Sequence, residues 1–315
     1  MTIFHGVADR PADMPETAVA IGNFDGVHVG HAAVIRSAVA LAAERGLAPA
    51  VLTFDPHPAQ VLHPERAPKL IMTMPQRLAG LAALGVEYVC VVQFSAEFAR
   101  LSPAEFVDQC LAQALRAKLV LVGEEFRFGH RRSGSVATLR DLGVEVQPLS
   151  PVEWRSARAG STPIRELLEA GQVSRAARLL GRPFALLGPV IKGQGIGSKQ
   201  TVPTLNLAPE NALLPGDGVY VTRTTDVATG GRSITNIGNR PTFGGTERTV
   251  ETFLLDPFSE PTPDRIEVGF LRYVRTERKF DKPEELKAQI LRDVAVAMKL
   301  HRRLDNMKQG KTSPC

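Results

Sequence analysis

The fold of the amino-terminal half is indicated by the stretch IGNFDGVHVGH, residues 21–31. An apolar run, AVAIGNF, leads into it, and a segment with helical periodicity, HAAVIRSAVALAAER, follows it. Its three glycines allow the backbone to approach an anion, and a helix start adds a positive dipole. The stretch therefore predicts either a phosphate-binding turn that uses His28 and His31 or a structural strand-to-helix turn with two incidental histidines.

The order of apolar and helical patterns predicts two domains. Up to residue 149 the short runs PAVLTF, VCVVQF, LVLVG and VEVQPL alternate with helical segments, which is typical of a mostly parallel sheet covered on both faces. After residues 181–183, glycine and proline punctuate the runs GVYVTR, VETFLL and IEVGFLRY, which indicates an antiparallel barrel or sandwich. A helical segment with apolar residues at four-residue spacing, Leu286 to Met298, comes last.

Chain length supports the same division, because 315 residues exceed what one core usually holds, about 250 to 300. We expect an α/β domain over residues 1–182, an antiparallel β-barrel domain ending in a long helix over 183–305, and a flexible tail over 306–315.

Composition restricts the class of protein. The chain is 43% hydrophobic and 23% charged, as in globular domains, and its net charge of +5 suits an anionic small molecule as well as a nucleic acid. The three cysteines form no Cys-x-x-Cys pair, and we find neither a signal-peptide pattern nor an apolar run of about 20 residues. We expect a cytoplasmic protein in a reducing environment that is not inserted in a membrane.

The string GNFDGVHVGH resembles the mark of the His-x-Gly-His nucleotidyltransferases, and its longer form is similar to the bacterial bifunctional riboflavin kinase and FAD synthetase family. Three more blocks resemble that family in order: TFDPHP (53–58), VGEEFRFGHRRSG (122–134) and GSTPIRELLEAG (160–171). In the second half, PTLN (203–206), GVY (218–220), NIGNRPTFGG (236–245) and VETFLLD (250–256) resemble its kinase domain. The resemblance implies phosphorylation of riboflavin to FMN and adenylylation of FMN to FAD.

For the adenylyltransferase, the resemblance implies a Rossmann-like domain that needs no protein nucleophile, because the FMN phosphate attacks ATP directly. His28, His31 and Arg165 would stabilise the charge that develops. The residues expected to bind ATP are Gly22, Asn23, Phe24, Asp25, Gly26, His28, His31, Ser161, Thr162 and Arg165, although Asp25 could equally cap the turn. The residues expected to bind flavin are Phe54, Pro56, His57, Pro58, Phe126, Arg127 and Phe128, where each phenylalanine has core packing as the alternative.

For the kinase, the resemblance makes Glu251 the base that accepts the proton of the riboflavin 5′-hydroxyl; without it, a solvated glutamate on a strand is the simpler interpretation. Thr204 and Asn206 would hold Mg²⁺. The remaining expected contacts are Gly193, Gly195 and Gly197 for ATP, and Arg275, Lys279 and Phe280 for flavin. The chain departs from the family pattern at Ser198, Thr201, Val202, Leu205 and residues 261–264.

Other classes fit the sequence less well. A basic run, His301 to Arg303, accompanies no nucleic-acid-binding module, and the histidines have no zinc-ligand spacing. Two rivals remain: an FMN adenylyltransferase whose second domain only binds flavin, and a transferase of the same superfamily with another phosphorylated acceptor. We expect riboflavin, FMN and ATP as the small-molecule partners, with no nucleic acid and no membrane among the partners.

Overall fold

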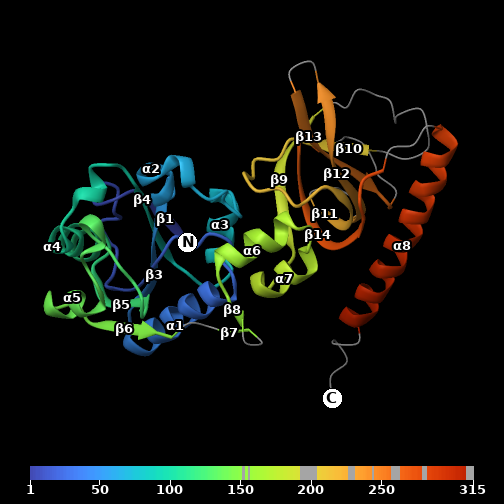
Figure 1. Ribbon diagram of the computed structural model, residues 1–315. Coiled ribbons are helices and arrows are strands. Elements are labelled where there is room, and N and C mark those ends of the chain that lie inside the picture. Colours follow the sequence, from blue (N-terminus) through green and yellow to red (C-terminus); the bar gives the residue numbers. More distant parts are fainter. Residues whose placement is uncertain are drawn as a thin grey trace. The chain divides into compact units, whose positions relative to one another are not determined.

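The computed structural model describes residues 1–150, 153–154, 157–191, 204–225, 231–242, 245–256, 263–278 and 282–309 (Figure 1). Its chain divides into two compact units, Met1–Ser161 and Thr162–Cys315. The helices of residues 161–180 therefore start at the unit border and continue in the second unit, whereas the sequence suggested a border at residue 182.

The first unit is built on a six-stranded sheet with the order β1-β4-β3-β2-β5-β6, in which every neighbouring pair is parallel. Its strands are β1 (Thr2–Phe4), β2 (Thr17–Ile21), β3 (Ala48–Asp55), β4 (Tyr88–Gln93), β5 (Ala117–Gly123) and β6 (Val146–Leu149). All five residues of β2 are buried, as expected for a central strand covered on both faces. This confirms the predicted α/β domain.

Helices surround this sheet. They are α1 (Val29–Arg45), α2 (Pro58–Leu62), α3 (Met74–Ala82), α4 (Pro103–Phe106), the π-helix η3 (Val107–Ala114), α5 (Val136–Asp141) and the 3₁₀ turns η1 (Pro64–Arg66), η2 (Phe98–Arg100) and η4 (His130–Arg132). A two-stranded sheet, β7 (Glu153–Trp154) and β8 (Ala157–Arg158), follows. Helix α1 packs against β2, β3 and β5 through its buried Ile35, Ala38 and Ala42.

The chain crosses the sheet in one direction from β2 to β4 and then returns to the other side of β2 with β5. In open α/β sheets, such a reversal leaves a crevice at the carboxyl ends of the strands, where ligands bind. The turn after β2, residues 22–28, lies at this edge. The topology thus places the His-x-Gly-His segment where a ligand site is expected.

The second unit begins with α6 (Ser161–Glu169) and α7 (Val173–Leu180) and then forms a closed barrel with the order β10-β13-β12-β11-β14-β9. Its strands are β9 (Phe184–Ile191), β10 (Thr204–Leu207), β11 (Gly218–Thr225), β12 (Arg232–Thr242), β13 (Gly245–Leu254) and β14 (Arg265–Arg275). All pairs are antiparallel. The barrel, and not the sandwich, is therefore the correct prediction.

Five buried hydroxyls form a hydrogen-bonded chain across three strands of the barrel. The chain runs from Thr224 to Ser233, Thr222, Thr235 and Thr252, with oxygen separations of 2.8 to 3.0 Å. Each hydroxyl can both donate and accept, so the chain gives every one of these buried groups a hydrogen-bond partner. Apolar interior residues such as Phe270 and Ile237 surround it in the barrel core.

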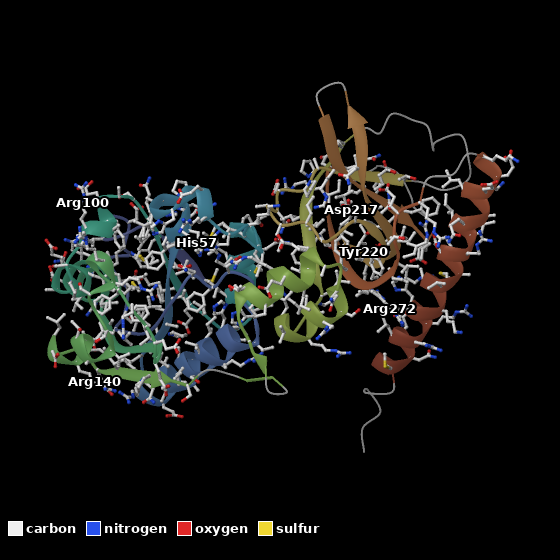
Figure 2. The ribbon with its side chains drawn as sticks, in the orientation of Figure 1. His57, Arg100, Arg140, Asp217, Tyr220 and Arg272 are labelled. Atoms are coloured by element: carbon white, nitrogen blue, oxygen red, sulfur yellow. The ribbon has the colours of Figure 1, made fainter. Side chains whose placement is uncertain are left out.

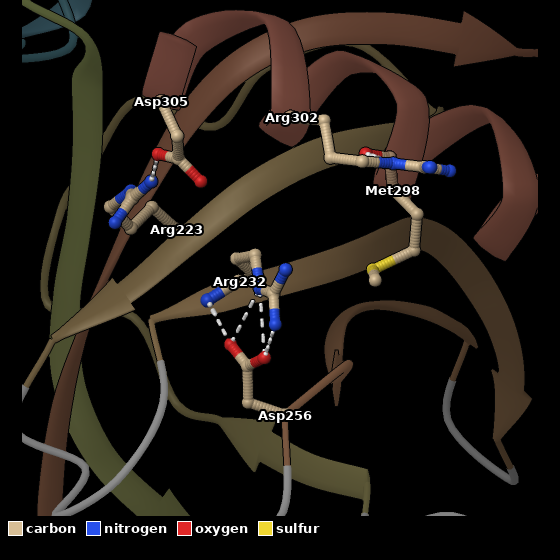
Figure 3. Close-up of polar contacts among 6 residues, drawn as sticks. All are labelled: Arg223, Arg232, Asp256, Met298, Arg302 and Asp305. Atoms are coloured by element: carbon tan, nitrogen blue, oxygen red, sulfur yellow. Dashed lines mark hydrogen bonds and ion pairs between the residues drawn. The ribbon is translucent and has the colours of Figure 1, made fainter. Parts of the chain in front are cut away.

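The last helix, α8 (Pro283–Gln309), packs against β12 (Figure 1) and runs four residues into the segment expected as a tail. Its buried face centres on Asp293, Ala297 and His301, one residue away from the stripe Ile290, Val294 and Met298. The shift arises because Asp293 is held by Arg275 of β14. Near its carboxyl end, Arg223 pairs with Asp305, with Nη2 and Oδ1 3.1 Å apart, beside the Arg232–Asp256 pair (Figure 3).

Candidate active sites

The turn after β2 has an unusual backbone. Phe24, Gly26 and Val27 have φ of 48°, 89° and 38°, and non-glycine residues rarely adopt such values outside functional sites. The Asp25 carboxylate fixes the turn, since Oδ1 accepts from the backbone N–H groups of Ile71 at 2.9 Å and Met72 at 3.2 Å. Asp25 is 2% exposed, and its carboxylate ties this turn to the segment before α3.

His28 caps the amino end of α1. Its Nδ1 accepts a hydrogen bond from the backbone N–H of His31 at 3.3 Å, so in the neutral ring the proton is on Nε2. The rings of His28 and His31 stack with centroids 3.6 Å apart and planes 18° from parallel. Gly30 makes room for this pair, because a Cβ there would lie 3.1 Å from the His28 ring. The two predicted histidines thus form one compact unit at a helix start.

The electrostatics favour a neutral imidazole at His31. Burial, the neighbouring His28 and the charge of Arg77 hold the pKa of His31 well below its usual range. Its Nδ1 is buried and has no hydrogen-bond partner among the described residues. Buried polar atoms without partners are uncommon, and this one is suited to a bound ligand.

Arg77 of α3 is a functional candidate that the sequence analysis missed. Its side chain is 1% exposed, and Nη1 donates to the backbone carbonyl of Phe54 at 3.1 Å. Burial lowers the pKa of Arg77, whereas Asp25 and Asp55 raise it, and an arginine stays charged in this balance. The sequence did contain a sign that Arg77 is buried: it lies four residues before the buried Leu81, on the apolar stripe of the helix.

Ser161 and Asn23, two further predicted ATP contacts, each have a hydrogen-bond partner in the first unit. The Ser161 hydroxyl donates to the carbonyl of Asp25 at 2.9 Å, and the Asn23 amide lies 3.1 Å from His57 Nε2 (Figure 2 labels His57). Thr162 and Arg165 follow Ser161 on α6 and belong to the second unit.

Six phenylalanines gather at the same edge of the sheet. Successive ring centroids are 5.1 to 6.3 Å apart along the series Phe54, Phe94, Phe98, Phe106, Phe128 and Phe126. Phe128 is 6% exposed and belongs to the core, the alternative left open for it, whereas Phe54 and Phe126 are half-buried at the rim. Phe94, Phe98 and Phe106 join the cluster without having been expected. Pro56, with a cis bond to Asp55, and Pro58 at the start of α2 follow Phe54, and Arg127 is exposed.

In the barrel, strand register brings the predicted kinase residues together. Glu251 on β13 lies directly opposite Asn206 on β10 and opposite Asn236 on β12. Directly paired residues share one face of a sheet, with Cβ atoms about 4.5 to 5.5 Å apart. Their neighbours Val250 and Thr252 are buried in the barrel, so the row Asn206–Glu251–Asn236 faces outward. Thr204 lies two residues before Asn206 and therefore on the same face.

Arg275, predicted to contact flavin, lies at the end of β14 and is bound by α8. Its Nε and Nη2 donate to the Asp293 carboxylate at 2.8 to 3.2 Å, and Gln289 donates to the same carboxylate at 2.8 Å. The Asp293 side chain is 7% exposed, which makes this a largely buried bidentate pair. Arg275 therefore anchors the end of β14. In the row Asn206–Glu251–Asn236, Asn236 is the residue that the sequence analysis did not single out.

The turn before β11 is also fixed by side chains. Arg248 donates to the Asp217 carboxylate, with Nε 3.0 Å from Oδ1, and to the carbonyl of Pro215 at 2.6 Å. The Tyr220 hydroxyl donates to the carbonyl of Gly216, and burial raises the pKa of Tyr220 (Figure 2 labels Asp217 and Tyr220). Gly193, Gly195, Gly197, Lys279 and Phe280 lie outside the described residues.

Each half of the chain matches a known protein family. The FAD synthetase family matches residues 10–163, and the riboflavin kinase family matches residues 180–301. The bifunctional riboflavin kinase/FMN adenylyltransferase of Escherichia coli K12 is 33% identical over 298 residues, which cover 93% of this chain and 95% of that protein. The Pseudomonas fluorescens protein of the same description is 33% identical over 305 residues, covering 95% and 98%.

A solved structure has the same fold. The crystal structure described as a macrolide-efflux protein from Streptococcus pneumoniae superposes with a TM-score of 0.85 at 29% identity, covering 94% of this chain and 98% of that one. In the part of the present chain that is described, no helix is long and apolar enough to cross a membrane.

The chain belongs to the bifunctional riboflavin kinase/FMN adenylyltransferase family. It is an enzyme that phosphorylates riboflavin to FMN and adenylylates FMN to FAD, with ATP as co-substrate. The prediction of family, fold class and function is confirmed. The transferase with another acceptor and the domain that only binds flavin are thereby set aside.

Proposed function

We propose that each activity belongs to one of the two outlined sites, with FMN adenylylation at the carboxyl edge of the parallel sheet and riboflavin phosphorylation on the outer face of the barrel. The observation that carries this proposal is the register that sets Glu251 opposite Asn206, because it assembles a carboxylate base beside oxygen ligands. The roles of individual residues follow from the geometry of each site.

At the sheet edge, ATP phosphates bind over the amino end of α1. Gly22 and Gly26 let the backbone approach, and His28 and His31 donate hydrogen bonds to the phosphates. The lowered pKa of His31 favours its neutral ring. The FMN phosphate attacks the α-phosphorus, and pyrophosphate leaves toward Ser161. These groups stabilise charge that develops in the transition state, so positioning and electrostatics supply the catalysis.

The half-buried rim of the aromatic cluster binds the flavin ring. Phe54 and Phe126 offer exposed ring surface, and Phe94, Phe98, Phe106 and Phe128 behind them keep that surface rigid. Arg77 binds no substrate in this scheme. Its charge adds to burial and to the neighbouring His28 in lowering the pKa of His31, and its Nη1 supports Phe54 through the carbonyl contact.

On the barrel, Glu251 accepts the proton of the riboflavin 5′-hydroxyl as that oxygen attacks the γ-phosphorus of ATP. The residues present fit a Mg²⁺ ion, since Thr204 and Asn206 offer hard oxygen ligands on one face, next to the base. Bound there, Mg²⁺ would share the charge of the ATP phosphates.

The metal assignment is tested by Thr204→Val and Asn206→Leu. Both variants should raise the Mg²⁺ concentration needed for half-maximal FMN formation at least tenfold, while FAD formation from supplied FMN keeps its Mg²⁺ dependence. Thr225→Val, at an exposed position of β11, is the matched control. An unchanged Mg²⁺ requirement in both variants would remove Thr204 and Asn206 from the metal site.

We also propose that the protein works in the cytoplasm and without nucleic acid. Cys90 and Cys110 are free, and burial raises their pKa to about 11 and about 12, so neither thiol is reactive at neutral pH. Fractionation of cells that produce the protein, with FAD formation as the assay, tests the compartment, and activity in the membrane fraction would contradict it.

A further inference from the structure

A second carboxylate lies on the outer face of the barrel, over Gly238 of β12. A Cβ at this glycine would lie 2.6 Å from the carboxyl carbon of Glu277 and 2.8 Å from its Oε2, so the carboxylate occupies the space that any side chain would need. Gly238 is buried although it lies two residues beyond Asn236 on the outward face. Glycine at this position is thus required for Glu277 to lie against the strand.

The backbone before Glu277 is fixed by the pair already described. Arg275 is held by Asp293 of α8, and its Nη1 donates to the carbonyl of Thr276 at 2.8 Å. These contacts set the direction in which the chain leaves β14. The Glu277 side chain is exposed and forms no hydrogen bond or ion pair with the described residues. A carboxylate placed by its neighbours but not paired with them is available to a ligand.

The strand order fixes which side of Glu251 this carboxylate occupies. Strands β10, β13 and β12 are consecutive, so Thr204 and Asn206 lie on one side of Glu251 and Gly238 lies on the other. A residue diagonal to Glu251, as Gly238 is, has its Cα about 7 to 8 Å away. If the phosphate donor is held at β10, the acceptor hydroxyl must reach Glu251 from the β12 side.

We propose that Glu277 binds the ribityl chain of riboflavin in the kinase site, accepting hydrogen bonds from the hydroxyls next to the one that is phosphorylated. An ionised carboxylate only accepts hydrogen bonds, and a polyol chain offers several donors in a row. Gly238 is the positioning residue that lets the carboxylate lie at the required depth. This inference rests on the proposed kinase site at Glu251.

The test is the steady-state kinetics of FMN formation by the full-length enzyme. Glu277→Gln should raise the KM for riboflavin tenfold or more, as expected when a hydrogen bond to a charged group is lost, and leave the KM for ATP within twofold. Lumiflavin, which has the flavin ring and no ribityl chain, should inhibit both proteins with the same Ki. Glu285→Gln, an exposed glutamate of α8, should match the wild type.

Gly238→Ala should reproduce the rise in KM, because its methyl group displaces the carboxylate, and the double variant should be no worse than Glu277→Gln alone. The proposal is overturned if the KM for riboflavin is unchanged, if the KM for ATP rises with it, or if lumiflavin inhibition weakens in parallel. Absence of FMN formation by the wild type would instead overturn the kinase site itself.

Discussion

Asn in place of Asp25 should unfold the adenylyltransferase unit more easily and abolish its activity. The carboxylate accepts hydrogen bonds from two backbone N–H groups and lies in the same buried region as Arg77. Each hydrogen bond to a charged group contributes about 1.5 to 3 kcal/mol, and a buried charge that loses its counter-charge costs about 3 to 5 kcal/mol. Because these contributions overlap, we expect a loss of about 3 to 5 kcal/mol for Asp25→Asn.

For a unit of this size, such a loss lowers the melting temperature by about 10 °C. Calorimetry of the full-length protein and assays of FMN formation from riboflavin and FAD formation from FMN measure the effect. FAD formation should fall by more than a hundredfold, since the turn that carries His28 is released, while FMN formation stays within twofold. Asp141→Asn, at an exposed position of α5, is the control. Wild-type melting and FAD formation in Asp25→Asn would refute the reasoning.

Further predictions concern protonation, anchoring and packing. Folding lowers the pKa of His31, so as the pH falls the unfolded chain binds a proton at this residue before the folded protein does. The free energy of unfolding should therefore decrease by up to about 1.4 kcal/mol per pH unit below about pH 6.5. His31→Asn should flatten this slope in urea unfolding measured from pH 5 to 7. Arg275→Lys keeps the charge but loses the bidentate geometry with Asp293, so FMN formation should weaken several-fold while FAD formation from FMN is retained. Gly134→Ala would place a methyl group 2.6 to 2.8 Å from the Phe128 ring and should cost about 1 to 3 kcal/mol in thermal unfolding; an unshifted melting curve would show that the ring moves freely.

The parts of the fold that sequence periodicity predicted are those decided by local patterns. The alternation of apolar runs and helices gave the parallel sheet, and Ser102 caps the start of α4, where a serine is expected. The strand β1 was missed, because three residues carry no periodic signal and its partner β4 is more than 80 positions away. The face of α8 was shifted because a buried ion pair, Arg275–Asp293, outweighs the apolar stripe.

The site residues also divide into those that a local sequence pattern predicts and those that it does not. His28, His31 and Asp25 belong to one contiguous string, so the sequence could present them together. Arg77, Asn236 and Glu277 reach their sites through contacts between distant segments, and such contacts depend on register and helix docking that no local pattern encodes. Glu251 lies between these two cases. Its role could be predicted from the family resemblance, but the residues beside it became known only from the strand pairing.

The most direct test of two separate sites is complementation between two defective enzymes. Riboflavin, ATP and Mg²⁺ are incubated with Glu251→Gln, with His31→Asn, or with a mixture of both, and FMN and FAD are resolved over time; His5→Asn, at an exposed histidine, is the control. We predict no product from Glu251→Gln, accumulation of FMN alone with His31→Asn, and FAD from the mixture. Loss of both activities in either single variant, with both proteins folded, would contradict the assignment of one reaction to each site.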